Sequence, residues 1–223
     1  LQNKVVAPYT LDLHTIMRAA RTLSSEIDLE RLITKLMDIV LKNSGAQKGM
    51  MFLTFNDDLK PVAKGSIDED IIFLKNEERV NYPQHIVHYV AKSLEPVILS
   101  NAAFIGMFTN DNYIKKEKSK SVLCFPILHQ GKLVGIVYLE NNAMTHAFSV
   151  ERIETLNILS SQAAISIENA FLYENLEMKV KERTEQLVTA YDHLEKANQD
   201  LADAEKLRRQ FISDISHDLR SPI

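Results

Sequence analysis

The chain has 223 residues, a formal net charge of −4, 45% hydrophobic residues and 25% charged residues, a composition typical of a soluble protein with one or two domains. Its near-neutral charge argues against a dedicated nucleic-acid-binding protein, which would normally carry a basic face. The single cysteine, Cys124, excludes an internal disulfide framework and favours a reducing compartment, so we expect a cytoplasmic protein. No apolar run approaches the roughly 18 residues that a membrane-spanning helix needs.

The start of the chain indicates a linker followed by two helices. The opening LQNKVVAPYT has neither an initiator methionine nor a signal-peptide core, so we expect both termini to lie inside a longer protein and residues 1–10 to be a linker. Apolar residues at helical spacing predict amphipathic helices over residues 11–23 and 28–44. Asp28 is a plausible N-cap for the second helix and Gly45 a plausible end.

The middle of the chain predicts a mostly antiparallel sheet flanked by helices, an α+β architecture. The expected elements are strands at 49–55 and 59–65, a helix at 85–94, a strand at 96–100, a long loop at 102–120, and strands at 121–129 and 132–141. The last two strands form the clearest hairpin, because Gln130-Gly131 joins two runs of apolar residues.

The distribution of glycine and proline predicts a long helix in the second half of the chain. The last glycine is Gly135, and the next helix-breaking residue is Pro222. Glycine and proline are the main punctuators of local structure, so their absence from residues 136–221 argues against a second compact domain in this stretch. Ser149 is a suitable N-cap for a helix that continues without a stop signal.

A seven-residue repeat lies within this expected helix. Its apolar positions are Val180, Leu187, Leu194 and Leu201, with alanines three residues after each leucine. Such a repeat is typical of a left-handed coiled coil, so we expect residues 177–206 to form a dimeric signalling helix. The alanine row makes the seam weak, which suits a helix that switches between two packings. A passive spacer is the alternative reading.

The chemistry-bearing residues lie in the final segment, FISDISHDLRSPI. His217 lies on the helix face away from Leu219, where a neutral imidazole is exposed and can act as a nucleophile. Asp218 can accept the proton of one ring nitrogen and leave the other nitrogen free to attack. Arg220 adds a positive charge near the position of an arriving phosphoryl group.

The string SHDLRSP, from Ser216 to Pro222, resembles the H-box of sensor histidine kinases. This resemblance implies that His217 accepts the γ-phosphoryl group of ATP and that Asp218 activates it. Ser221 stands where relatives place a residue that aids dephosphorylation. Residues 207–223 would then be the truncated start of the dimerisation and phosphoacceptor domain.

The segment SVLCFPILHQGKLVGIVYLEN and the residues that follow it are similar to the second half of GAF sensor domains from multidomain histidine kinases. The resemblance extends over residues 11–176 and includes the FTNDNYI loop. It implies a central antiparallel sheet, a pocket between sheet and loop, and dimer contacts through the first and last helices of the domain. A fold of this kind does not fix a ligand.

The sequence gives limited support to the known classes of GAF ligand. A bilin would be attached to a cysteine followed by histidine, whereas Cys124 precedes Phe125, so we expect a buried structural thiol and no bilin. Asn141, Phe148 and Glu151 match only part of a cyclic-nucleotide signature, which also needs a lysine and an aspartate that are missing here.

Two other groups of residues are weaker candidates for a ligand site. His85 and His88, three apart on a helix, could share a metal or haem, but without a third ligand we expect no metal site. Aromatic side chains could either line a pocket or pack in the core. These residues are Tyr89, Phe104, Phe108 and Tyr113.

The sequence therefore predicts the sensor-to-transmitter segment of a histidine kinase. Its expected partners are a second copy of the chain, a separate domain that binds ATP with Mg²⁺, a response-regulator receiver domain and an unidentified small molecule. Without the ATP-binding domain the segment should be inactive alone. The alternative is a GAF and coiled-coil dimerisation or ligand-binding module in which the H-box is vestigial, or a GAF protein that only stores a ligand.

Overall fold

The computed structural model describes residues 13–56, 58–74 and 80–218, without the side chains of residues 13–16, 217 and 218. In chain order the elements are α1 (Leu13–Ser24), α2 (Leu29–Ser44), β1 (Lys48–Phe55), β2 (Asp58–Ser66), β3 (Ile72–Phe73), α3 (Gln84–Ser93), β4 (Val97–Leu99), α4 (Asn112–Glu117), β5 (Ser121–His129), β6 (Lys132–Asn141) and α5 (Val150–Asp218). The chain divides after Leu172 into a unit that contains the sheet and a second, helical unit.

The six strands form one sheet in the order β3-β2-β1-β6-β5-β4, and each neighbouring pair is antiparallel. The predicted α+β class and the hairpin of β5 and β6 are confirmed. At the turn of this hairpin, Gln130 and Gly131 have φ angles of 49° and 79°. Positive φ at both turn residues matches the twist of a two-residue hairpin, and Gly131 adopts it without strain.

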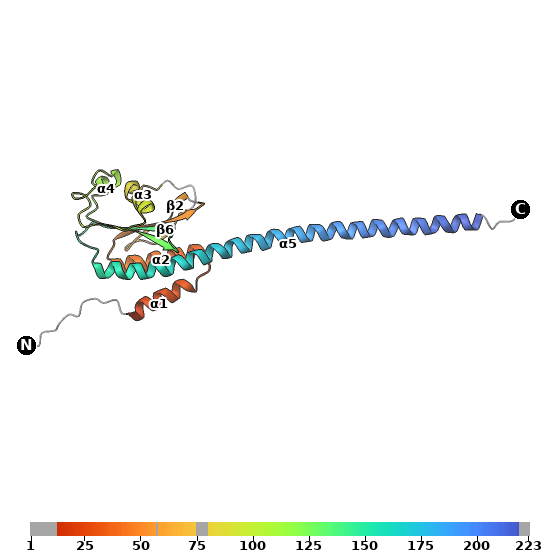
Figure 1. The fold of residues 1–223 in the computed structure, drawn as a ribbon, viewed down its shortest axis with the longest axis horizontal. Helices are drawn as coiled ribbons and strands as arrows, with labels where there is room; N and C mark the ends of the chain where they lie inside the picture. Colours follow the sequence, from red (N-terminus) through yellow and green to blue (C-terminus); the bar gives the residue numbers. More distant parts are fainter. Residues whose placement is uncertain (1–12, 57, 75–79, 219–223) are drawn as a thin grey trace, which may run out of the picture. The chain divides into compact units, whose positions relative to one another are not determined.

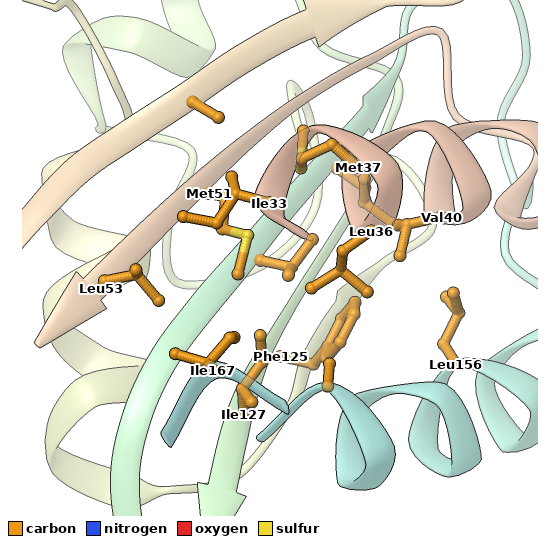
Figure 2. Close-up of a cluster of buried hydrophobic side chains, with 14 of the residues drawn as sticks. Ile33, Leu36, Met37, Val40, Met51, Leu53, Phe125, Ile127, Leu156 and Ile167 are labelled. Carbon is orange, nitrogen blue, oxygen red and sulfur yellow. The ribbon is translucent and has the colours of Figure 1, made fainter. Parts of the chain in front are cut away.

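Alternating side chains of the central strands fill two cores, one on each face of the sheet. We call the core on the side of α2 and α5 the first core, and the core on the side of α3 and α4 the second core. In β1, Met51 and Leu53 pack with α2 and the start of α5, whereas Phe52 packs on the other face with α3. Figure 1 shows α2 and α5 on one side of the sheet and α3 and α4 on the other. Figure 2 shows the first core, where Leu36 of α2 and Ile167 of α5 point toward the strands. Successive side chains in a strand point to opposite faces of the sheet, so every second residue contributes to the same core.

The ends of α2 follow the capping signals in the sequence. The Asp28 carboxylate accepts a hydrogen bond of 2.8 Å from the Arg31 backbone N–H, which satisfies one of the free donors of the first turn. Gly45 ends the helix with a φ of 80°. The positive φ favours glycine here, and a side chain would also have to displace the Arg152 guanidinium.

Two short elements differ from the sequence predictions. The region 102–120 is not a continuous loop, because it contains α4, whose first turn is capped by the Asp111 carboxylate. The two-residue strand β3 was not predicted. With six residues in α4 and two in β3, neither element is long enough for its hydrophobic pattern to repeat several times, so the pattern carries little information about them.

The long helix predicted after Ser149 is confirmed as α5, and the Ile153 backbone N–H donates to the Ser149 carbonyl at 3.1 Å. Residues 156–170 of α5 supply apolar side chains to the first core. From Tyr173 to Ser216 every residue of the helix is exposed in the single chain. The row of Val180, Leu187, Leu194 and Leu201 is therefore an uncovered apolar stripe. No helix within the described residues has the length and apolarity needed to cross a bilayer.

Candidate functional site

A buried carboxyl group lies on β6, at the edge of the second core. The Glu140 side chain is 1% exposed, and its Oε2 atom accepts hydrogen bonds of 3.0 Å from the Ser119 hydroxyl and from the Tyr138 hydroxyl. Its Oε1 atom is also buried and accepts no hydrogen bond from the residues that the structure describes. The ammonium group of Lys48 is 3.8 Å from Oε1 and 3.3 Å from the Glu117 carboxylate. Among the described residues, Oε2 of Glu140 thus accepts two hydrogen bonds, whereas Oε1 accepts none.

Burial raises the pKa of Glu140, because the charged form loses its hydration. The hydrogen bonds from Ser119 and Tyr138 and the charge of Lys48 act in the opposite direction but do not cancel this effect. Burial also raises the pKa of Tyr138 and Tyr113, and the nearby Glu140 adds to both shifts. In each of these groups the folded protein stabilises the protonated form relative to the same group in water.

The stability of the sheet unit is expected to fall as the pH rises above the ordinary pKa of glutamate. The unfolded chain releases the Glu140 proton first, and the folded chain holds it to higher pH, so the unfolded state binds fewer protons and gains stability relative to the folded state. In urea denaturation at a series of pH values, Glu140→Gln should lose this decrease in the free energy of unfolding. Glu168→Gln, on exposed helix surface, should keep it; an unchanged slope in Glu140→Gln would contradict the assignment.

A cavity of about 510 Å³ lies beside α3 and the segment that precedes α4; we name it the α3 cavity. It is lined by His85, His88, Tyr89, Lys92, Met107, Phe108, Asn110 and Asp111. The Asp111 carboxylate in this lining contacts both α3 and α4. Its Oδ2 atom accepts from the His85 backbone N–H at 3.2 Å and lies 2.9 Å from the His85 Nδ1 atom, while Oδ1 accepts from the Tyr113 N–H at 2.8 Å.

The predicted pocket aromatics separate into three environments. Tyr89 and Phe108 line the α3 cavity with their ring centroids 5.6 Å apart at a steep angle. Tyr113 is buried against Tyr138 in the second core, and Phe104 is exposed. The sequence could not separate these positions, because aromatic residues are common both in cores and in ligand pockets.

Two of the other ligand candidates, Cys124 and Asn141, occupy structural positions. Cys124 is buried in the second core, where burial raises the pKa of its thiol. The Asn141 side chain donates to the Gly45 carbonyl at 2.8 Å and accepts from two backbone N–H groups of the following turn. His85 and His88 share the α3 cavity, and in the described part of the chain no three His, Cys, Asp or Glu side chains group as a metal ion would require.

The predicted phosphoacceptor pair lies at the end of α5. His217 and Asp218 are the last two helical residues, and their side chains are outside the described part of the structure. Arg220 and Ser221 also lie outside the described residues.

The buried group of Glu140, Ser119 and Tyr138 was not predicted from the sequence. A usable signal was present, because Glu140 stands in the apolar run KLVGIVYLEN and an acidic residue is rarely buried without partners.

With the fold and these sites described, comparison with known proteins defines the class of this chain. The model of the GAF domain family matches residues 28–167, more than half of the chain. The protein therefore belongs to the GAF domain family, here followed by a long helix.

Several of the curated relatives are histidine kinases. The hybrid signal transduction histidine kinase G of Dictyostelium discoideum is 42% identical over 138 residues, which is 62% of this chain and 4% of that protein. The histidine protein kinase 1 of Candida albicans is 23% identical over 220 residues, which is 95% of this chain and 8% of that protein. The chain thus spans less than a tenth of the length of either kinase.

Among solved structures, a bacteriophytochrome from the photosynthetic bacterium R. palustris is similar with a TM-score of 0.58. The match covers 82% of this chain and 42% of that chain at 12% sequence identity. At this level of identity the similarity concerns the fold alone.

Proposed function

We propose that this chain is the sensor-to-transmitter segment of a histidine kinase, in which the GAF unit controls phosphorylation of His217 through a dimeric signalling helix. The observation that carries the proposal is the combination of a GAF domain with one helix that extends to Asp218, within the sequence SHDLRSP. The alignment with the Candida albicans kinase supports it, since that match includes 95% of this chain and not the GAF domain alone.

His217 is the nucleophile of the proposed reaction. A ring nitrogen of its imidazole attacks the γ-phosphorus of ATP; a nitrogen–phosphorus bond forms, the bond to the bridging oxygen breaks, and ADP leaves. Asp218 accepts the proton from the other ring nitrogen. The ATP, with Mg²⁺, would be held by a separate catalytic domain, and the phosphoryl group would pass to an aspartate of a response-regulator receiver domain.

The continuity of α5 supports the proposed path from input to output. The same helix supplies buried residues such as Leu156 and Ile167 to the first core and carries His217 in its last turn. A change in the packing of α5 against the sheet can therefore reach His217 without crossing a flexible loop. The exposed stripe of Val180, Leu187, Leu194 and Leu201 provides the seam along which two copies would change their packing.

The proposal predicts that His217→Gln abolishes phosphorylation. The isolated catalytic domain of a histidine kinase would be added in trans with labelled ATP, and acid-labile phosphate on this chain would be measured. Wild type should be labelled and His217→Gln should fall to background, because glutamine has no nucleophilic ring nitrogen. His193→Gln, on an exposed part of the same helix, is the matched control and should be labelled like wild type.

Equal labelling of wild type and His217→Gln would overturn the assignment of the phosphoacceptor. Absence of label on wild type, in a chain that still forms a stable dimer, would instead favour a dimerisation module with a vestigial H-box. These results are distinguishable, because the dimer is measured separately by sedimentation.

A further inference from the structure

The α3 cavity lies on the outer side of α3 and not between α3 and the sheet. The residues of α3 that line it are His85, His88, Tyr89 and Lys92, whereas Ile86, Val87 and Val90 turn the opposite face of the helix into the second core. The layer between α3 and the sheet is filled by side chains such as Phe52 and Tyr138, which are fully buried. The cavity therefore lies outside the layer between α3 and the sheet, and Phe108 is both part of its lining and part of the second core.

The electrostatic character of the α3 cavity favours an anion. Both oxygens of the Asp111 carboxylate accept from backbone N–H groups of α3 and α4, and the His85 ring lies beside Oδ2, so Asp111 already has its partners within the protein. Among the residues that the structure describes, neither His88 nor Lys92 forms an ion pair with a carboxylate. One ammonium group and a second imidazole are thus available to a ligand, and a cation would meet uncompensated positive charge.

The apolar lining of the cavity favours an aromatic body on that anion. Tyr89 and Phe108 meet edge to face, an arrangement that presents both a ring face and a ring edge to a third ring. Met107 is 74% exposed beside them, and its thioether is suited to contact with an aromatic ring. The volume of about 510 Å³ is in the range of small-molecule sites.

Asp111 and His85 are held in position by contacts within the protein. Asp111 joins the first turn of α3 to the first turn of α4, because its two carboxylate oxygens accept from both helices. The same carboxylate orients the His85 ring through the Nδ1 atom at 2.9 Å. With the imidazole held on one side and Lys92 two turns along the same helix face, the cavity has a polar side and an aromatic side.

From these observations we propose that the α3 cavity binds a small aromatic anion, recognised by Lys92 and His88 at the acidic group and by Tyr89 and Phe108 at the ring. This gives a ligand class to the sensor role of the proposed function. The binding itself can be measured whether or not His217 accepts phosphate.

The test uses the complete chain and the fluorescent probe 2-naphthoate. The chain contains no tryptophan, so fluorescence anisotropy of the naphthyl ring can be followed with little protein background. We expect saturable binding of 2-naphthoate, and about tenfold weaker binding of the neutral 2-naphthalenemethanol, since the alcohol cannot form the charge-assisted contacts. An added arm with 2-naphthyl phosphate distinguishes a carboxylate ligand from a phosphate ligand, and tighter binding of either anion than of the alcohol supports the proposal.

Charge-reversal variants locate the site. Lys92→Glu should weaken 2-naphthoate binding about tenfold, and the matched control Lys115→Glu, on an exposed position of α4 outside the cavity, should bind like wild type. Tyr89→Ala should also weaken binding, because it removes half of the aromatic pair. Binding that is absent at millimolar probe, equal for the alcohol, or reduced equally by Lys92→Glu and Lys115→Glu would overturn the proposal.

Discussion

The double variant Leu187→Glu/Leu194→Glu is expected to be monomeric at concentrations at which the wild-type chain is a dimer. Both leucines lie on the stripe that is exposed in one chain and is not covered by any of the residues that the structure describes. Burying a leucine side chain contributes about 1.5–3 kcal/mol, and the two substitutions remove four such side chains from a dimer. They also place like charges in the seam, so the dissociation constant should rise by at least about a thousandfold.

Sedimentation velocity across a dilution series measures this change. The matched control is Val188→Glu/Gln199→Glu, which adds the same two charges at exposed helix positions outside the stripe and should leave the mass unchanged. A seam variant that sediments like wild type would show that α5 does not hold the dimer through this stripe. The terminal helices of the GAF unit would then be the remaining candidate interface.

The second large effect is expected from Phe52→Ala, which should lower the free energy of unfolding by about 3–5 kcal/mol. Phe52 is fully buried in the second core, where its ring meets the edge of Tyr82 with centroids 4.9 Å apart. Truncation leaves a cavity between β1 and α3 that the surrounding side chains fill only in part. Chemical denaturation monitored by circular dichroism would give the change in free energy.

Phe104→Ala provides the comparison at the other extreme of burial. Its ring is 82% exposed, so the same chemical change should alter the free energy of unfolding by less than about 0.5 kcal/mol. Similar losses in both variants would mean that the second core does not depend on Phe52. The pair separates the effect of burial from that of removing a phenyl ring.

Secondary structure was predictable wherever a hydrophobic period extended over several turns or a full strand. The α2 helix follows its apolar stripe between Asp28 and Gly45, and the β5–β6 hairpin follows the Gln130-Gly131 turn. The short helix α4 escaped detection, although its cap at Asp111 is an ordinary helix-start signal, because six residues contain too few apolar positions to establish a period.

The candidate sites were harder to predict than the fold. His85 and His88 were visible as a pair, but Asp111, the partner of His85, is distant in sequence. It meets His85 only because α3 and α4 lie on the same face of the sheet. Glu140 could be recognised as a charge in an apolar strand. Its pairing with Ser119 and Tyr138, and its unpaired oxygen, depend on how β6 packs beside the segment after α4.

The sequence by itself determined the alternation of the strands, the helix that runs to His217, the heptad stripe on that helix and the motif at its end. These are local or periodic features, and backbone geometry translates them directly into one face of a helix or a sheet. Only the tertiary structure decided which aromatic rings are buried and which line the α3 cavity, and which carboxylates find donors. Those properties depend on contacts between residues far apart in the chain, and no local period encodes them.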